Sequence, residues 1–91
     1  MLEDKTILVT GGTGSFGKKL TEIVLSRYNP RKLIIYSRDE LKQYEMRQRY
    51  GGDKYRSIRY FIGDVRDRDR LYRAFDGVDI VIPNDIGTLS T

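Results

Sequence analysis

The chain alternates short apolar runs with longer segments in which apolar residues recur at three- or four-residue intervals. Residues 5–10 form a short β-branched run with three consecutive apolar residues, 7–9, and end at glycines, which is typical of a strand buried on both faces of a parallel sheet. Residues 15–28 show helical spacing before Asn29-Pro30 ends the pattern. The two patterns repeat and predict strands at 5–10, 32–36, 57–62 and 78–82 and helices at 15–28, 39–50 and 68–75.

This alternation predicts an α/β fold, because strands that alternate with helices form parallel sheets through right-handed crossovers. We expect one domain with a four-stranded sheet in the order 3-2-1-4 and helices on both faces. Residues 78–82 would then form an apolar sheet edge, and such edges pair with other chains. We therefore expect a homo-oligomer in which residues 78–82 extend the sheet of a second copy.

A glycine-rich segment, TGGTGSFG, follows the first strand and begins the first helix at residues 10–17. Its spacing fits G-x-G-x-x-G in the context that this dinucleotide-binding pattern requires. Gly12, Gly14 and Gly17 take this spacing, while Gly11, Gly14 and Gly17 fit G-x-x-G-x-x-G. The early glycines permit a tight turn, Gly14 lets a pyrophosphate approach the backbone, and Gly17 lets helix and strand pack closely. The helix N-terminus adds unpaired N–H groups for phosphate. The alternative is a tight turn without a ligand; the absence of Gly-Lys-Ser/Thr excludes a Walker loop.

The second strand ends at Ser37-Arg38, where NAD-binding domains usually carry an acidic residue. Arg38 can bind a 2′-phosphate in a bidentate manner, and Lys42 lies one helical turn further on. Asp39 is expected to cap the following helix. The residues therefore favour NADP over NAD, the alternative being that Arg38 is an ordinary surface arginine.

Gly63-Asp64-Val65 follows the third strand, beside the expected adenine position. Asp64 can accept a hydrogen bond from the adenine amino group, and Val65 can pack on the ring. Asp64 can instead, or in addition, cap the helix that begins near Arg68.

Composition narrows the function classes. The net charge of +4 favours anionic ligands. Arginines among Tyr44, Tyr50, Tyr55 and Tyr60 raise a nucleic-acid alternative, but no helix-turn-helix or aromatic sheet motif accompanies them, so no nucleic acid is expected. The chain has no Cys or His, so no metal site is predicted. No signal peptide or apolar run of membrane-spanning length is present, which favours a cytoplasmic protein without a membrane partner.

Three segments together resemble the inverting UDP-N-acetylglucosamine 4,6-dehydratases, bacterial extended short-chain dehydrogenase/reductases: TGGTGSFG at 10–17, SRDELKQ at 37–43 followed by Met46, and GDVRD at 63–67. The resemblance covers residues 3–82 and only about the first quarter of a family enzyme. It implies a truncated Rossmann fold, residues 1–91 being the N-terminal half of an NADP-binding domain. The cofactor-binding candidates are Gly11, Thr13, Gly14, Ser15, Phe16, Gly17, Ser37, Arg38, Lys42, Asp64 and Val65.

The resemblance ends after residue 82. Family members continue with His-Ala-Ala-Ala and later carry a Tyr-x-x-x-Lys pair, whereas residues 83–91 form a divergent tail and no such pair is present. No catalytic residue is predicted, and a UDP-sugar substrate is expected only for a full-length enzyme. We interpret the chain as the NADP-binding portion of a dehydratase for bacterial surface polysaccharide or glycan biosynthesis, inactive as this fragment. The alternative is a non-enzymatic NADP-sensing module.

Overall fold

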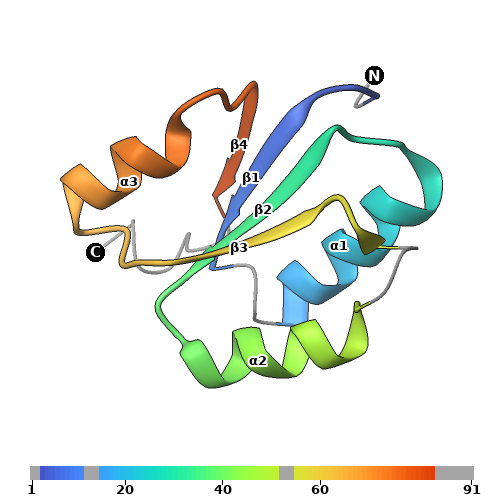
Figure 1. The fold of residues 1–91 in the computed structure, drawn as a ribbon, viewed down its shortest axis with the longest axis horizontal. Helices are drawn as coiled ribbons and strands as arrows, with labels where there is room; N and C mark the ends of the chain where they lie inside the picture. The colour runs from blue at the N-terminus through green and yellow to red at the C-terminus, as the bar shows by residue number, and fades with distance from the viewer. Residues whose placement is uncertain (1–2, 12–14, 52–54, 84–91) are drawn as a thin grey trace.

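The computed structural model describes residues 3–11, 15–51 and 55–83. The elements occur in the predicted order, and their arrangement is shown in Figure 1. They are β1 (Thr6–Thr10), α1 (Ser15–Arg27), β2 (Lys32–Ser37), α2 (Glu40–Arg49), β3 (Ile58–Ile62), α3 (Arg68–Phe75) and β4 (Ile80–Pro83).

The four strands form one parallel sheet in the order β3-β2-β1-β4, as predicted. Alternating side chains on β1 divide the core between the two faces of the sheet. Ile7 and Val9 pack with residues of α1 and α2, including Val24 and Met46, whereas Leu8 packs with Ala74 of α3. The helices therefore cover both faces, and all five residues of β1 are buried. No described helix is long and apolar enough to span a bilayer.

The last strand begins two residues later than predicted, at Ile80 rather than Val78. Gly77 has a φ of 75°, and Val78 donates a backbone hydrogen bond to Phe75 within the turn that follows α3. Asp79 then contacts the start of β1: its N–H donates to the Thr6 carbonyl (2.8 Å) and its carboxylate accepts from the Thr6 N–H (2.9 Å). The turn and this side-chain bond therefore precede the ladder between β4 and β1.

Two aspartates set where helices begin. Asp39 caps α2, its side chain accepting the Lys42 N–H at 3.0 Å, as the sequence predicted. Asp67 caps α3 by accepting the Arg70 N–H at 3.2 Å. The interpretation of Asp64 as the cap of this helix is therefore wrong, because Asp67 stands at the position whose carboxylate reaches the first turn.

Candidate cofactor-binding edge

The described parts of the three predicted cofactor segments lie at one edge of the sheet, because the carboxyl ends of parallel strands lie together (Figure 1). Backbone hydrogen bonds join them beyond the ends of the strands. The Gly11 N–H donates to the Tyr36 carbonyl at 2.8 Å, and the Gly63 N–H donates to the Ser37 carbonyl at 3.0 Å. This edge is where open α/β sheets bind ligands.

The glycine loop enters this edge through Gly11, whose φ of 63° suits a residue without a Cβ. Gly12, Thr13, Gly14 and the side chain of Ser15 lie outside the described residues. α1 begins at Ser15 with no acidic residue in its first turn, so no carboxylate there repels an anion. Phe16 is 57% exposed, whereas Gly17 is buried and its carbonyl accepts the Thr21 hydroxyl at 2.8 Å.

Arg38 and its neighbours form the second part of the edge. The Ser37 side chain is buried and accepts the Asp39 N–H at 3.1 Å, whereas Arg38 and Lys42 are exposed. The Arg38 side chain keeps 73% of its surface accessible and contacts the Asp64 carboxylate at 3.4 Å between Nη1 and Oδ2. Its guanidinium therefore lies at the edge with most of its donors facing solvent.

Asp64 is held mainly by Arg66. The Arg66 N–H and Nε donate to Oδ1 at 3.0 and 3.2 Å, and Nη2 donates to Oδ2 at 2.8 Å. These bonds, with a smaller contribution from the charge of Arg38, hold the pKa of the Asp64 carboxyl well below its ordinary value. Asp64 thus links two cations, a role that sequence reasoning missed although Arg66 lies only two positions away.

Replacing Arg66 with Ala is therefore expected to raise the pKa of Asp64 toward its ordinary value. The folded pKa is below the unfolded one, so the ion pairs stabilise the fold above the ordinary pKa of Asp and are lost as pH falls through the folded pKa. A carboxyl-carbon NMR titration of both proteins measures the shift. Identical Asp64 midpoints in the two proteins would contradict the assigned ion pair.

Val65 and Tyr36 connect the edge to the core. Val65 is half-buried and packs against the cluster of Leu8, Tyr36 and Ala74, so part of its side chain lies in the core between the sheet and α3. The Tyr36 side chain is fully buried, its hydroxyl donates to the Asp64 carbonyl at 2.9 Å, and its ring stacks on Phe61 with 5.6 Å between centroids. Sequence reasoning treated Tyr36 only as a strand residue, because its partners lie 25 and 28 positions further along the chain.

Gln43 is the second residue that sequence reasoning missed. It is 2% exposed, and its Nε2 group donates to the carbonyls of Ser37 (3.1 Å) and Phe61 (3.2 Å). The helical segment around Gln43 is mostly hydrophilic, so its sequence did not indicate that this polar side chain is buried. Its place three residues before Met46, on the same helical face, was the available indication.

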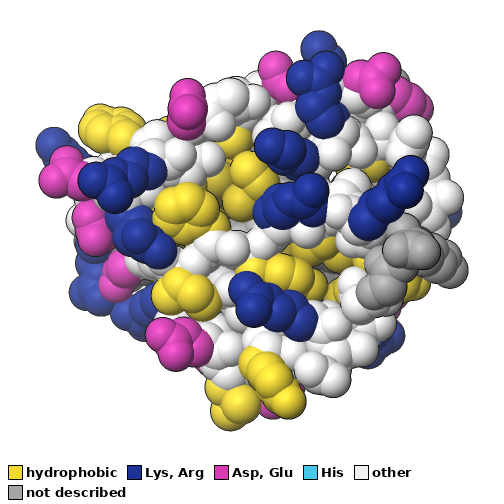
Figure 2. All heavy atoms as spheres, viewed as in Figure 1, with side chains coloured by type: hydrophobic (Ala, Val, Ile, Leu, Met, Phe, Trp, Pro, Cys, Tyr) yellow, Lys and Arg dark blue, Asp and Glu magenta, His cyan; other side chains and the backbone are white. Residues whose placement is uncertain are grey.

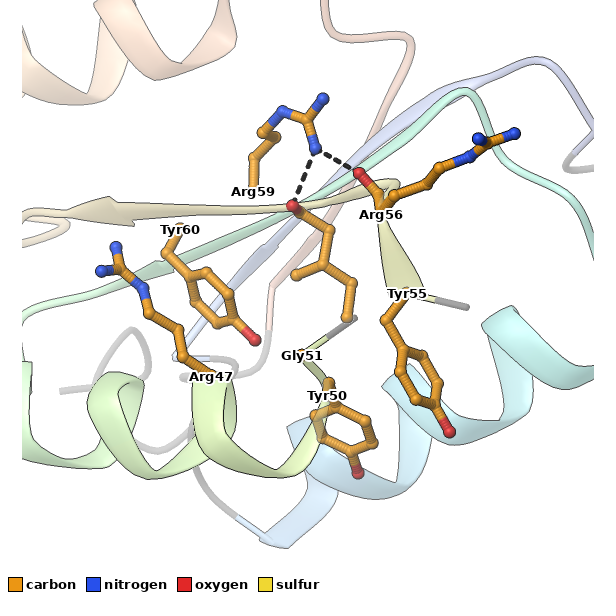
Figure 3. A pocket seen from close by; sticks show the side chains of 8 residues that line it. Arg47, Tyr50, Gly51, Tyr55, Arg56, Arg59 and Tyr60 are labelled. Atoms are coloured by element: carbon orange, nitrogen blue, oxygen red, sulfur yellow. Dashed lines mark hydrogen bonds between the residues drawn. The ribbon is translucent and has the colours of Figure 1, made fainter. Parts of the chain in front are cut away.

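A pocket of about 440 Å³ lies away from this edge, toward the amino end of β3 and the end of α2 (Figure 3). Its lining residues are Arg47, Tyr50, Gly51, Tyr55, Arg56, Ile58, Arg59 and Tyr60. The guanidinium of Arg47 lies over the Tyr60 ring at 5.0 Å, while the Arg56 side chain extends in the opposite direction. Arg59 bonds to nearby backbone carbonyls. The arginines therefore do not converge on a common point.

Charge at the surface is mixed. Lys and Arg side chains are spread across the face shown in Figure 2, with acidic side chains mainly toward its margins and exposed apolar side chains between them. Several arginines bind carboxylates, including Arg49, whose Nη2 contacts Glu22 Oε1 at 2.7 Å. The same carboxylate accepts the Tyr50 hydroxyl, and burial together with this bond raises the pKa of Tyr50 to about 12. The distribution gives no continuous basic groove on this face.

Comparison with known proteins confirms the similarity that the motifs indicated. The chain is 56% identical to an inverting UDP-N-acetylglucosamine 4,6-dehydratase of Campylobacter jejuni over 82 residues, 90% of this chain and 24% of the enzyme. It superimposes on the X-ray structure of Pen from Bacillus thuringiensis with a TM-score of 0.81 and 37% identity, over 89% of this chain and 24% of that one.

A wide-type short-chain dehydrogenase/reductase from Veillonella parvula, solved in complex with NADP, shares the fold. The TM-score is 0.69 and the identity 20%, over 87% of this chain and 34% of that one. The chain thus spans about a quarter of the length of the curated dehydratase that it matches. The family model described as polysaccharide biosynthesis protein matches residues 7–84, and the chain therefore belongs to this family.

Proposed function

We propose that this chain is the NADP-binding part of a nucleotide-sugar 4,6-dehydratase that acts on UDP-N-acetylglucosamine in bacterial surface polysaccharide or glycan biosynthesis. The observation that carries the proposal is the geometry of the sheet edge. An exposed arginine, Arg38, follows β2 where an acidic residue would select NAD, and it contacts Asp64; the Gly11 N–H bonds to Tyr36, two residues before Arg38. The 56% identity to a dehydratase supports the nucleotide-sugar assignment.

The described residues fit a dinucleotide phosphate. The start of α1 offers backbone N–H groups without a nearby carboxylate, so Ser15, Phe16 and Gly17 would hold the pyrophosphate together with Gly11, Thr13 and Gly14 of the loop. Ser37, Arg38 and Lys42 would hold the 2′-phosphate, while Asp64 and Val65 would flank adenine. When bound, the nicotinamide would supply the hydride acceptor that the dehydratase reaction requires.

Titration of the chain with NADP and NAD tests the proposal. We expect saturable binding of NADP and weaker binding of NAD in isothermal calorimetry, because the guanidinium of Arg38 contributes only when a 2′-phosphate is present. No turnover of UDP-N-acetylglucosamine is expected from this chain, since its sequence offers no candidate for the catalytic chemistry. Equal affinity for the two dinucleotides would refute the assignment to NADP.

We further propose that the chain forms a dimer through β4. Among the described strands, β4 pairs only with β1, and Val81 on it is 41% exposed. Pairing would involve residues 80–82, because Pro83 has no N–H to donate to a ladder. We expect a concentration-dependent rise in mass by light scattering, which Val81→Lys should suppress by adding charge at the edge. A monomer mass for the unmodified chain at high concentration would exclude this dimer.

A further inference from the structure

The Gln43 side chain joins two strands at the candidate edge. One Nε2 group donates to the carbonyl of Ser37, the last residue of β2, and to the carbonyl of Phe61 in β3. The Ser37 carbonyl also accepts the N–H of Gly63, so it receives one bond from the ladder and one from α2. A single buried amide therefore bridges these two strands where their regular pairing ends.

The residues that follow this junction are those that the proposed function assigns to the adenosine end of NADP. Arg38 comes directly after Ser37, and Asp64 directly after Gly63; their side chains meet at 3.4 Å between Nη1 and Oδ2. The Arg38 side chain is 73% exposed and that of Asp64 is 29% exposed, and both backbones start from the junction that Gln43 bridges. A change in the junction would therefore move the cation relative to the carboxylate.

The Oε1 atom of Gln43 makes the buried amide costly for stability. It is buried and has no hydrogen-bond partner in the described structure. Turning the amide over would place Oε1 against two carbonyl oxygens, so the carbonyls of Ser37 and Phe61 fix its orientation. A methionine would fill a similar volume without a buried unpaired acceptor. What the amide adds over such a residue is the connection between the two strand ends.

We propose that Gln43 is a positioning residue for the 2′-phosphate subsite, holding the ends of β2 and β3 so that Arg38 and Asp64 present their side chains at the ribose. The inference rests on the proposed function. It assigns a role to the last residue of the SRDELKQ segment, whose side chain is too buried to reach a ligand itself.

The test compares Gln43→Met with Met46→Leu. Met46 is also buried, lies one turn further along the same face of α2, and contacts the apolar core. For Gln43→Met we expect the dissociation constant for NADP to rise roughly tenfold while that for NAD changes by less than about threefold. Met46→Leu conserves volume and leaves both constants near their original values. A purely structural role for Gln43 would alter thermal stability without changing the NADP/NAD preference.

Gln43→Glu provides a second variant of nearly unchanged size. A carboxyl group cannot reproduce both bonds, because it donates to neither carbonyl when ionised and to only one when protonated, so the same loss of NADP preference is expected. Unchanged preference in a folded variant of either kind overturns the inference, and so does failure of both variants to fold, which would make Gln43 a folding determinant. If the unmodified chain does not bind NADP, both the proposed function and this inference are refuted. If it binds NADP and the Gln43 variants keep the same NADP/NAD preference, only this inference is refuted.

Discussion

Replacing Gly63 with Ala is expected to lower the free energy of unfolding by about 2–3 kcal/mol, the upper part of the range for an overpacked site. A Cβ at this position would lie 2.6 Å from Cζ and 2.8 Å from Cε2 of Tyr36, and closer still to its hydroxyl. The Tyr36 ring cannot withdraw, because it is fully buried, stacks on Phe61 and is bonded through its hydroxyl to the Asp64 carbonyl. Urea unfolding of the two proteins measures the difference.

Gly77→Ala is the matched control. Gly77 has a φ of 75°, but no atom lies within 4 Å of an added Cβ, so this substitution carries only the backbone cost of about 1 kcal/mol. Adding Tyr36→Phe to Gly63→Ala should recover part of the lost stability, because it removes the nearest atom. If Gly63→Ala were no more destabilising than Gly77→Ala, the close packing of Tyr36 on Gly63 would be incorrect.

Replacing Arg38 with Ala is expected to weaken NADP binding by about 1.5–3 kcal/mol, the range for a hydrogen bond to a charged group, which corresponds to roughly a 10- to 150-fold higher dissociation constant. NAD should be little affected, since it lacks the 2′-phosphate. The Arg38 side chain is 73% exposed and its contact with Asp64 is long, so its removal should not disturb the fold. Calorimetric titration with both dinucleotides, at one fixed ionic strength, measures the two changes.

Arg66→Ala controls for the general loss of positive charge. Arg66 binds the same carboxylate and its side chain is equally exposed, but it follows β3 rather than β2. We expect a smaller loss of NADP affinity than with Arg38→Ala. Equal weakening of NADP and NAD by Arg38→Ala would show that Arg38 does not recognise the 2′-phosphate.

Much of the fold could be predicted from the sequence, because its signals are local. The apolar run that ends in the glycines at 11–12 and the helical spacing after Ser15 specify a strand, a turn and a helix within about 25 residues. Repetition of that unit gives parallel strands joined by right-handed crossovers. The glycine-rich segment after the first strand indicates the doubly wound order that the structure shows. Asp39 was predicted as a cap for the same reason, since the capping carboxylate and the N–H that donates to it lie only three residues apart.

Only the tertiary structure decided what the side chains at the edge do. Asp64 binds Arg66 and Arg38 instead of capping α3, and Val65 packs partly into the core. Gln43 and Tyr36 reach backbone groups 18 and 28 residues away. The sequence alone determined which segments become strands and helices and that a glycine-rich segment joins β1 to α1, because those properties depend on neighbours along the chain. The contacts of Gln43 and Tyr36 and the ion pair of Asp64 with Arg38 depend on the register of β2 against β3, and that register exists only after the sheet has assembled.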